Sequence, residues 1–302
     1  MSVALPTATQ EVEPPEGGIL SLLRRGRRDG RVTGLLIGGV VLFVCIILFG
    51  VLGPVFVHQS LAQVGAVDPN LPPSGAHLLG TDGQGRDVLA AMIYSTPETV
   101  KIGLIAGAIG VGIGVVLALL AGFFRGPVDA VIGAVSDSLL TIPGIAILIV
   151  IANHLTQLTA ISLGLAIASL SWMVPTRLMR AQVLSVRERT YIAVARMGGE
   201  SELEIAFREV MPNILPFAAA SLVWAVSSAV LASVGLAALG LGTGDVSLGS
   251  AVYWMMTYSA VLRGEWWWFG PPMIIIGLLF LSLLMMSLGM DRFVNPRLND
   301  RG

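Results

Sequence analysis

Long apolar stretches separated by short polar segments dominate this chain. Six of them are long enough to cross about 30 Å of hydrocarbon as an α-helix that rises about 1.5 Å per residue. They cover residues 34–56, 102–124, 131–152, 160–179, 215–240 and 273–290. The pattern therefore predicts an all-α integral membrane protein with six transmembrane helices.

The distribution of basic residues predicts the orientation of these helices. Hydrophobic residues make up 55% of the chain and charged residues only 12%, yet the charges are placed unevenly. With a cytoplasmic N-terminus, 15 of the 18 lysines and arginines fall in cytoplasmic segments, and only Arg86, Lys101 and Arg263 lie outside. The positive-inside rule then puts both termini in the cytoplasm. Residues 266–268, three tryptophans, fall on the outer side, where amphipathic rings favour the headgroup layer.

The chain divides into five parts on this basis. Residues 1–23 are expected to be a disordered cytoplasmic tail, because their start is rich in Pro, Glu and Thr and lacks an apolar run. Residues 24–57 form an N-terminal anchor helix whose apolar run is too long for a cleaved signal. An external or interfacial segment follows at 58–98, then a core domain at 99–292 and a short cytoplasmic tail at 293–302.

The residue types that carry catalysis or bind metals are scattered. Cys45 is the single cysteine, and the three histidines, His58, His77 and His154, have no carboxylate at ligand spacing, so they are interpreted as surface residues. The only lysine, Lys101, does not follow the glycines of a phosphate-binding loop. We therefore expect no catalytic residue, metal or cofactor on this chain, and an energy source on a partner.

Asp137 is the one clear charge inside a predicted helix, six residues before Pro143. With Pro143 it is a candidate gate or hinge. The plainer alternative is a carboxylate that hydrogen-bonds a neighbouring helix end. A single shallow carboxylate argues only weakly for the ion coupling of a secondary carrier.

The longest cytoplasmic connection follows the fourth predicted span and has a helix-turn-helix pattern. Helix-forming residues continue from 185 to 197, and Gly198 and Gly199 allow the positive dihedral angles of a reversal. Ser201 with Glu204 fits a capping box for a second helix. Pro212 is expected to end that helix.

The second helix of this loop carries an apolar stripe at helical spacing. The stripe either packs beneath the rest of the loop and the membrane bundle or docks into a groove on a cytoplasmic partner. Its members are Leu203, Ala206, Phe207 and Val210.

Two outer segments also have alternative interpretations. Thr81 and Asp82 could cap an interfacial helix, with Arg86 and Asp87 solvated or paired, or this segment could contact an external binding protein. The apolar and aromatic residues 248–260 either lie in the outer interface or re-enter the bundle.

Two motifs give the chain a resemblance to a known family. The run SWMVPTRLMRAQVLSVRERTYIAVARMGG, followed by Pro212, resembles the coupling-loop signature, or EAA loop, of ATP-binding-cassette importer permeases. The run LLGTDGQGRDV at 78–88 resembles the Gly-Thr-Asp-x-x-Gly-Arg-Asp element of the dipeptide, oligopeptide and nickel branch. Similar residues to that branch also stand at Asp129, at Asp137 with Pro143, at 240–242 and at 266–272. The N-terminal arrangement resembles the branch's second, C-type permease.

The resemblance assigns residues to two sites. Ala193 departs from the signature because the family usually has an acid there, and Gly198 and Glu209 often correspond to Leu and His. The residues implied in ATPase coupling, within the loop at 185–212, are Arg187, Glu188, Tyr191, Ala193, Val194, Ala195, Arg196, Gly198, Gly199, Glu200, Phe207, Glu209 and Pro212. The external motif consists of Gly80, Thr81, Asp82, Gly85, Arg86 and Asp87.

The resemblance implies a type I importer permease architecture in a prokaryotic cytoplasmic (inner) membrane. Its implied partners are a second permease, two cytoplasmic ATPases that bind ATP and magnesium, an external solute-binding protein and the lipid bilayer, without nucleic acid. Short peptides are the first expected substrate, with oligosaccharides or a nickel complex as alternatives. A stand-alone secondary carrier or channel and a membrane scaffold remain the alternatives from other classes.

Overall fold

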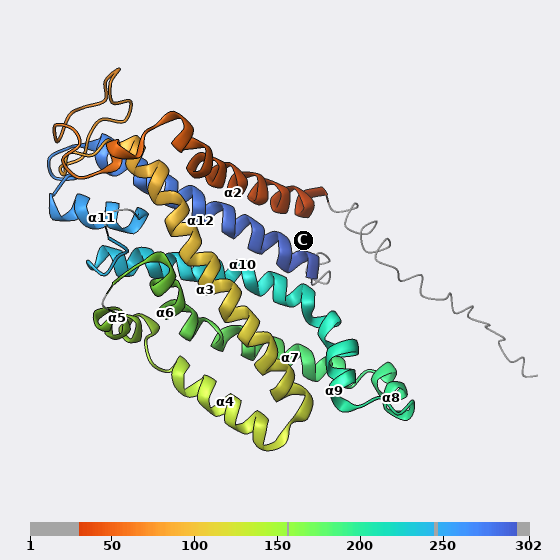
Figure 1. Ribbon diagram of the computed structural model, residues 1–302. Coiled ribbons are helices and arrows are strands. Elements are labelled where there is room, and N and C mark those ends of the chain that lie inside the picture. Colours follow the sequence, from red (N-terminus) through yellow and green to blue (C-terminus); the bar gives the residue numbers. More distant parts are fainter. Residues whose placement is uncertain (1–29, 156, 245–246, 295–302) are drawn as a thin grey trace, which may run out of the picture.

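The structure, a computed structural model, describes residues 30–294 except 156 and 245–246 (Figure 1). Helices make up most of this part, which contains no strand beyond an isolated antiparallel bridge between Thr81 and Asp87. Four continuous helical stretches are long and apolar enough to cross a membrane. They are α2 (Gly30–Phe56), α3 (Val88–Phe124), the stretch that ends with α10 (Met211–Ala238), and α12 (Trp266–Val294).

Two further spans consist of bent helix pairs. The angle is 85° between α4 (Gly126–Leu140) and α5 (Gly144–His154), and 42° between α6 (Ala160–Ser171) and α7 (Met173–Arg187). Counted as one span each, the pairs bring the total to six, the number that the sequence predicts. The spans expected at 131–152 and 160–179 are thus each divided into two helices. Pro143 follows the first break, and Pro175 cannot donate to the carbonyl of Ser171 at the second, so both interrupt the helical ladder.

The helix α3 is the central element of the bundle and packs against α2, α6, α7 and α10 (Figure 1). It begins at Val88, well before the predicted start at residue 102, so the last part of the segment expected to be external, 88–98, is helical. Its small residues let α10 approach closely: a Cβ added to Gly107 would lie 2.6 Å from Val226 Cγ2. Helix packing thus explains these glycines.

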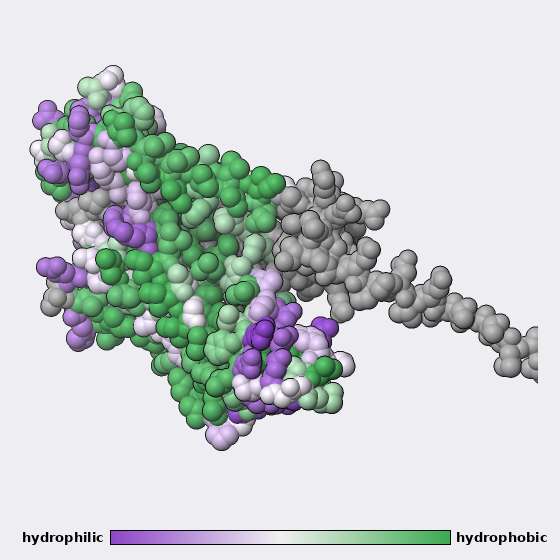
Figure 2. All heavy atoms as spheres, turned by 45° about the vertical axis from the view of Figure 1, so that its right-hand side comes forward, coloured by the Kyte–Doolittle hydropathy of each residue, from purple (hydrophilic) through white to green (hydrophobic). Residues whose placement is uncertain are grey.

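Two polar ends and an apolar belt divide the molecular surface (Figure 2). The apolar belt includes the outward side of α2, where Cys45 is exposed and Val55 is 78% exposed. One polar end carries the segment between α2 and α3, with η1 (Gln59–Ala62), together with α11 (Leu248–Thr257). At the other end lie the beginning of α2, the end of α12, α8 (Thr190–Met197), α9 (Glu202–Ile205) and η2 (Ala206–Val210) (Figure 1).

Candidate functional site

The first helix of the coupling loop is broken where the sequence predicts continuity. Helix α7 ends at Arg187, Arg189 is extended with φ −74° and ψ 146°, and α8 begins at Thr190. The residues at this break are held from outside the loop: Arg187 donates to the backbone oxygen of Phe123, and Glu188 pairs with Arg125. These tertiary contacts explain why the helix-forming residues of 185–197 form two helices.

The reversal after α8 depends on one glycine rather than two. Gly199 has φ +85°, a conformation that favours glycine, whereas Gly198 is the α-helical C-cap with φ −71°. The expectation that both need positive dihedral angles is therefore wrong for Gly198. Ser201 caps α9 as predicted, because its Oγ accepts from the Glu204 backbone N–H at 3.2 Å. The Glu204 carboxylate pairs with Arg208 at 3.4 Å.

Pro212 does not end the second helix, contrary to the sequence expectation. The helical stretch runs from Glu202 to Ala238, and η2 is a single π-helical turn immediately before Pro212. Pro212 occupies the first turn of α10, where the usual amide donor is not required. A π-turn locally changes the hydrogen-bond register, which lets the chain continue through the proline.

The buried side of the loop packs on the ends of α3, α7 and α10. Phe123 and Val183 lie in the same hydrophobic cluster as Ile192, Ile205 and Val210, all 0–1% exposed. Ala206 and Val210 of the predicted stripe belong to this cluster. The first interpretation of the stripe, packing against the membrane bundle, is therefore correct for these two residues.

The other side of the loop exposes apolar side chains at this polar end of the molecule. Leu203 and Phe207, from the same predicted stripe, are 57% and 51% exposed. Together with three side chains of α8 they form a set that we call the loop patch. The loop patch consists of Tyr191, Val194, Met197, Leu203 and Phe207.

Met197 is the most exposed member of the loop patch, at 80%, and was missing from the predicted coupling residues. The available signal was its place in the last turn before the glycine reversal, where a side chain projects from the tip of the loop. Ala193 and Gly198 are exposed, whereas Ala195 and Glu200 are half-buried. Burial raises the pKa of the Tyr191 phenol above its ordinary value, so this group remains a neutral hydroxyl at neutral pH.

The loop is fastened to the turn between α3 and α4 through Phe123 and Arg125. The guanidinium carbons of Arg187 and Arg196 lie 5.5 and 5.7 Å from the centre of the Phe123 ring. Arg125 Nη2 lies 2.6 Å from Glu188 Oε1. Because the Phe123 ring is buried between two positive groups, displacement of α8 requires either the end of α3 to follow or these contacts to break.

Two ion pairs join α4 to α7 along the same side of the molecule. Arg180 binds both carboxylate oxygens of Asp129, with Nη2 2.7 Å from Oδ2. Arg177 lies 3.6 Å from Asp137, and both side chains are about two-thirds exposed, at 69% and 66%. Asp137 thus forms an ion pair with a side chain of α7 and not the expected hydrogen bond to a helix end, and its role as a gate or hinge stays a prediction. Pro143 stands at the bend between α4 and α5.

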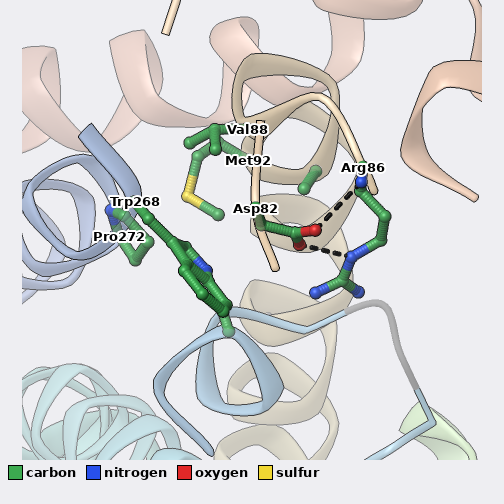
Figure 3. Close-up of a pocket in the computed structure, with 8 residues that line it drawn as sticks. Asp82, Arg86, Val88, Met92, Trp268 and Pro272 are labelled. Carbon is green, nitrogen blue, oxygen red and sulfur yellow. Dashed lines mark hydrogen bonds and ion pairs between the residues drawn. The ribbon is translucent and has the colours of Figure 1, made fainter. Parts of the chain in front are cut away.

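The external motif folds into a compact loop before α3 (Figure 3). Asp82 accepts from the backbone N–H groups of Gln84 and Arg86, and its Oδ2 lies 2.7 Å from Arg86 Nε. Thr81 Oγ1 accepts from Leu71 and donates to the Asp68 carbonyl. Gly80 and Gly85 have φ of +69° and +72°, which explains glycine at both positions of this turn.

Asp87, and not the Thr81–Asp82 pair, caps the following helix. Its Oδ1 accepts from the Ala90 backbone N–H at 2.9 Å, and its Oδ2 lies 2.8 Å from His77 Nδ1. The expectation that Thr81 and Asp82 cap a helix is therefore wrong, and so is the interpretation of His77 as a free surface residue. The cap and the motif together fix where α3 begins.

The motif is buried against the start of α12. Asp82 and Arg86 are each 2% exposed, and Trp268, also 2% exposed, packs beside them (Figure 3). The adjoining cavity of about 10 Å³ is too small for a ligand. Trp266 has the exposure that a headgroup position would require, whereas Trp268 is buried in a hydrophobic cluster with Met92 and Leu248. These motif residues support the outer end of the fold.

The helix α11 packs against α10 and α12 at the end of the bundle that carries the external motif. Ser247 and Ser250 form a reciprocal capping box at its start, and the Leu248 backbone N–H donates to Thr99 Oγ1 of α3 at 3.0 Å. Leu248 and Met255 are buried. Residues 248–260 are expected either to lie in the outer interface or to re-enter the bundle. The buried face of α11 packs against the bundle, which favours the second interpretation for that face. Across the described residues, no three His, Cys, Asp or Glu side chains group as metal ligands would.

Comparison with known proteins gives a consistent result. Residues 114–300 match a family described as binding-protein-dependent transport system inner membrane component. The oligopeptide transport system permease protein OppC of Lactococcus lactis subsp. lactis (strain IL1403) is 27% identical over 282 residues, which cover 92% of this chain and 96% of the relative.

Two further relatives have similar names. The dipeptide transport system permease protein DppC of Bacillus subtilis (strain 168) is 26% identical over 92% of this chain and 87% of its own length. The oligopeptide transport system permease protein OppC of Mycobacterium bovis is 35% identical over 60% of this chain and 63% of its own length.

Proposed function

The chain belongs to the binding-protein-dependent transport system inner membrane component family, and on that premise we propose that its coupling loop is the surface through which cytoplasmic ATPases drive it. It is a membrane permease subunit of an ATP-binding-cassette importer, similar to OppC and DppC over most of its length. The proposal concerns which residues couple it to its partners, how it is oriented and what it carries.

The loop patch is the observation that carries the proposal. Exposed apolar side chains normally lie in lipid or in a protein interface, and the loop patch projects beyond the apolar belt at a polar end (Figure 2). A short helix that offers apolar side chains fits the helix-in-groove mode of recognition. Val194 and Met197 of α8 are 57% and 80% exposed and would be the centre of that contact. The missing motif acid at Ala193 makes shape rather than charge the basis of docking.

Movement of the docked loop would reach the membrane helices through the contacts at Phe123 and Arg125. From this turn it would pass to α4, which the Asp129 and Arg180 pair also ties to α7. The helix α4 would then move with the loop, and the bend at Pro143 separates α4 from α5. This bend would therefore be a suitable hinge. ATP and magnesium would be bound by the partner ATPases.

The proposed orientation puts the coupling loop and both termini in the cytoplasm. The arginine-rich loop and the beginning of α2 lie at one end of the bundle, and the external motif lies at the other (Figure 1). The partners in this arrangement are a second permease, two cytoplasmic ATPases and an external solute-binding protein. The exposed faces of α4 and α5 are suitable for the second permease.

Short peptides are the proposed substrate, because the relatives that cover most of this chain are named for oligopeptide and dipeptide transport. The direct test is uptake of radiolabelled trialanine into proteoliposomes that contain both permeases and both ATPases, with the binding protein outside. We expect uptake only with ATP inside. Gradient-driven uptake by this chain alone would support a secondary carrier and overturn the proposal.

A further inference from the structure

A polar cleft of about 360 Å³ opens at the outer end of the bundle, away from the external motif's small cavity. It lies where the first turns of α3 meet the segment between α5 and α6 and the segment after α10. One acidic side chain and no basic side chain belong to its lining. The residues that line it are Gln59, Tyr94, Glu98, Leu158, Thr159, Ala160 and Thr243.

Glu98 places a carboxylate on the first part of α3, beside the α2 span. Its neighbour Pro97 lies against Gly50 of α2, where an added Cβ would be 2.6 Å from the proline ring, so Glu98 is level with a turn inside the α2 span. Charged side chains at such a level face water or protein rather than lipid. The Glu98 side chain is 36% exposed and belongs to the lining of the cleft.

Lys101 is the counter-ion of this carboxylate in the structure. Its Nζ lies 3.0 Å from Glu98 Oε1, and the lysine side chain is 53% exposed. An exposed pair of this kind contributes little to stability, so another cation can replace the lysine at small cost. Lys101 itself is not part of the cleft lining.

A second observation points to a ligand in the cleft. Thr243 Oγ1 is shielded from solvent and has no hydrogen-bond partner among the residues that the structure describes. Buried hydroxyl groups are normally paired, with protein, water or ligand. By contrast, the Tyr94 hydroxyl already donates to the Val57 carbonyl at 2.9 Å, and Thr159 is engaged with Ser162. Thr243 lines the cleft, so this unpaired hydroxyl lies beside the cleft wall and would reach a ligand after rotation of its side chain.

We propose that this cleft binds the amino-terminal end of a peptide as it enters the pathway, with Glu98 accepting from the α-ammonium group. This inference rests on the proposed function. A lining with one acid and no base selects the positive end of a peptide over its carboxylate end. The volume accommodates one or two residues.

The test is trialanine uptake by the complete importer in proteoliposomes with variants of Glu98. Glu98→Gln removes the negative charge and keeps the shape, so uptake should fall about tenfold, the effect of losing a charge-assisted hydrogen bond. ATP hydrolysis stimulated by the loaded binding protein should be unchanged. Glu98→Asp should retain at least about half of the wild-type uptake, because the carboxylate remains.

Two matched controls separate binding from structure. Lys101→Gln breaks the same ion pair but keeps the Glu98 carboxylate, and Asp68→Asn removes an exposed outer carboxylate away from the cleft. Both should transport trialanine as wild type does. A loss in Lys101→Gln equal to that in Glu98→Gln would overturn the proposal, and so would parallel loss of stimulated ATP hydrolysis or wild-type uptake by Glu98→Gln.

N-acetyl-trialanine distinguishes the remaining outcomes. If wild type carries it, Glu98→Gln should leave its uptake unchanged, and an equal loss for blocked and free peptides would overturn the assignment of the ammonium group. If wild type carries only the free peptide, trialanine uptake by Glu98→Gln, compared with uptake by Glu98→Asp and Lys101→Gln, decides whether the proposal holds. An importer that hydrolyses ATP but carries neither peptide would overturn the proposed function and this inference with it.

Discussion

The guanidinium carbon of Arg196, in the coupling loop, lies 5.7 Å from the centre of the Phe123 ring at the end of α3. Arg187 approaches the same ring at 5.5 Å. The loop that we propose as the docking surface is thus in direct contact with the central membrane helix.

Phe123→Leu should weaken coupling while leaving the hydrophobic cluster filled. The leucine retains an apolar side chain but removes both cation–π contacts, each worth about 0.5–1 kcal/mol or more. Peptide uptake per ATP hydrolysed should therefore fall about threefold or more in the reconstituted importer. Phe124→Leu is the matched control, because that neighbouring ring is 42% exposed and no cation–π contact involves it in the described residues. Equal effects of the two substitutions would refute this role.

Asp129→Asn should lower the free energy of unfolding by about 1–3 kcal/mol, because Arg180 loses a charged, two-oxygen partner. Asp137→Asn should cost about 0–1 kcal/mol, since its ion pair with Arg177 is exposed and 3.6 Å long. Thermal unfolding in detergent, compared between the two variants, checks this order. A larger loss of stability in Asp137→Asn than in Asp129→Asn would show instead that the exposed pair of Asp137 with Arg177 holds α4.

Gly199→Val should impair the loop through backbone strain alone. The φ of +85° is unfavourable for a β-branched residue, by about 1–2 kcal/mol, although no atom lies within 4 Å of an added Cβ. Gly199→Asn is the control, since asparagine tolerates this region better. Measured by ATPase co-purification, the valine variant should bind less than the asparagine variant. Comparable binding by both would show that the reversal does not position the docking surface.

Asp82→Asn should destabilise the outer end by about 3 kcal/mol, because Arg86 is buried and loses this carboxylate. Asp68→Asn, an exposed carboxylate in the same segment, should change stability by less than about 0.5 kcal/mol. Protease sensitivity of the segment between α2 and α3, in intact membranes, reports the difference. Equal resistance of the Asp82 variant and the wild type would contradict the structural role assigned to this pair.

Much of the fold follows from local sequence patterns. Apolar length alone gives six candidate spans, which agrees with the structure when each bent helix pair is counted as one. The turn chemistry of Gly199 and Ser201 gives the reversal and cap of the loop. What the pattern misses depends on tertiary contacts. The break at Arg189 needs the partners of Arg187 and Glu188 at the end of α3, which lie more than sixty positions earlier in the chain.

The candidate sites show the same division. The signature locates the loop, but burial decides which side of it is free: Ala206 faces the bundle whereas Phe207 faces outward, although both lie on the predicted stripe. Pro212 misleads because a preceding π-turn lets the helix continue. Glu98 has no local motif, and only the meeting of α3 with two distant segments makes it part of a cleft.

The central claim, that ATPases drive this permease through the loop patch, is tested most directly by co-purification of the ATPases with Met197→Asp. A carboxylate at this exposed position would be desolvated in an apolar groove, so ATPase recovery and ATP-dependent peptide uptake should both fall at least about tenfold. Leu78→Asp, at a 68% exposed site on the opposite end, should keep normal ATPase recovery. Wild-type recovery and uptake in Met197→Asp would contradict the account.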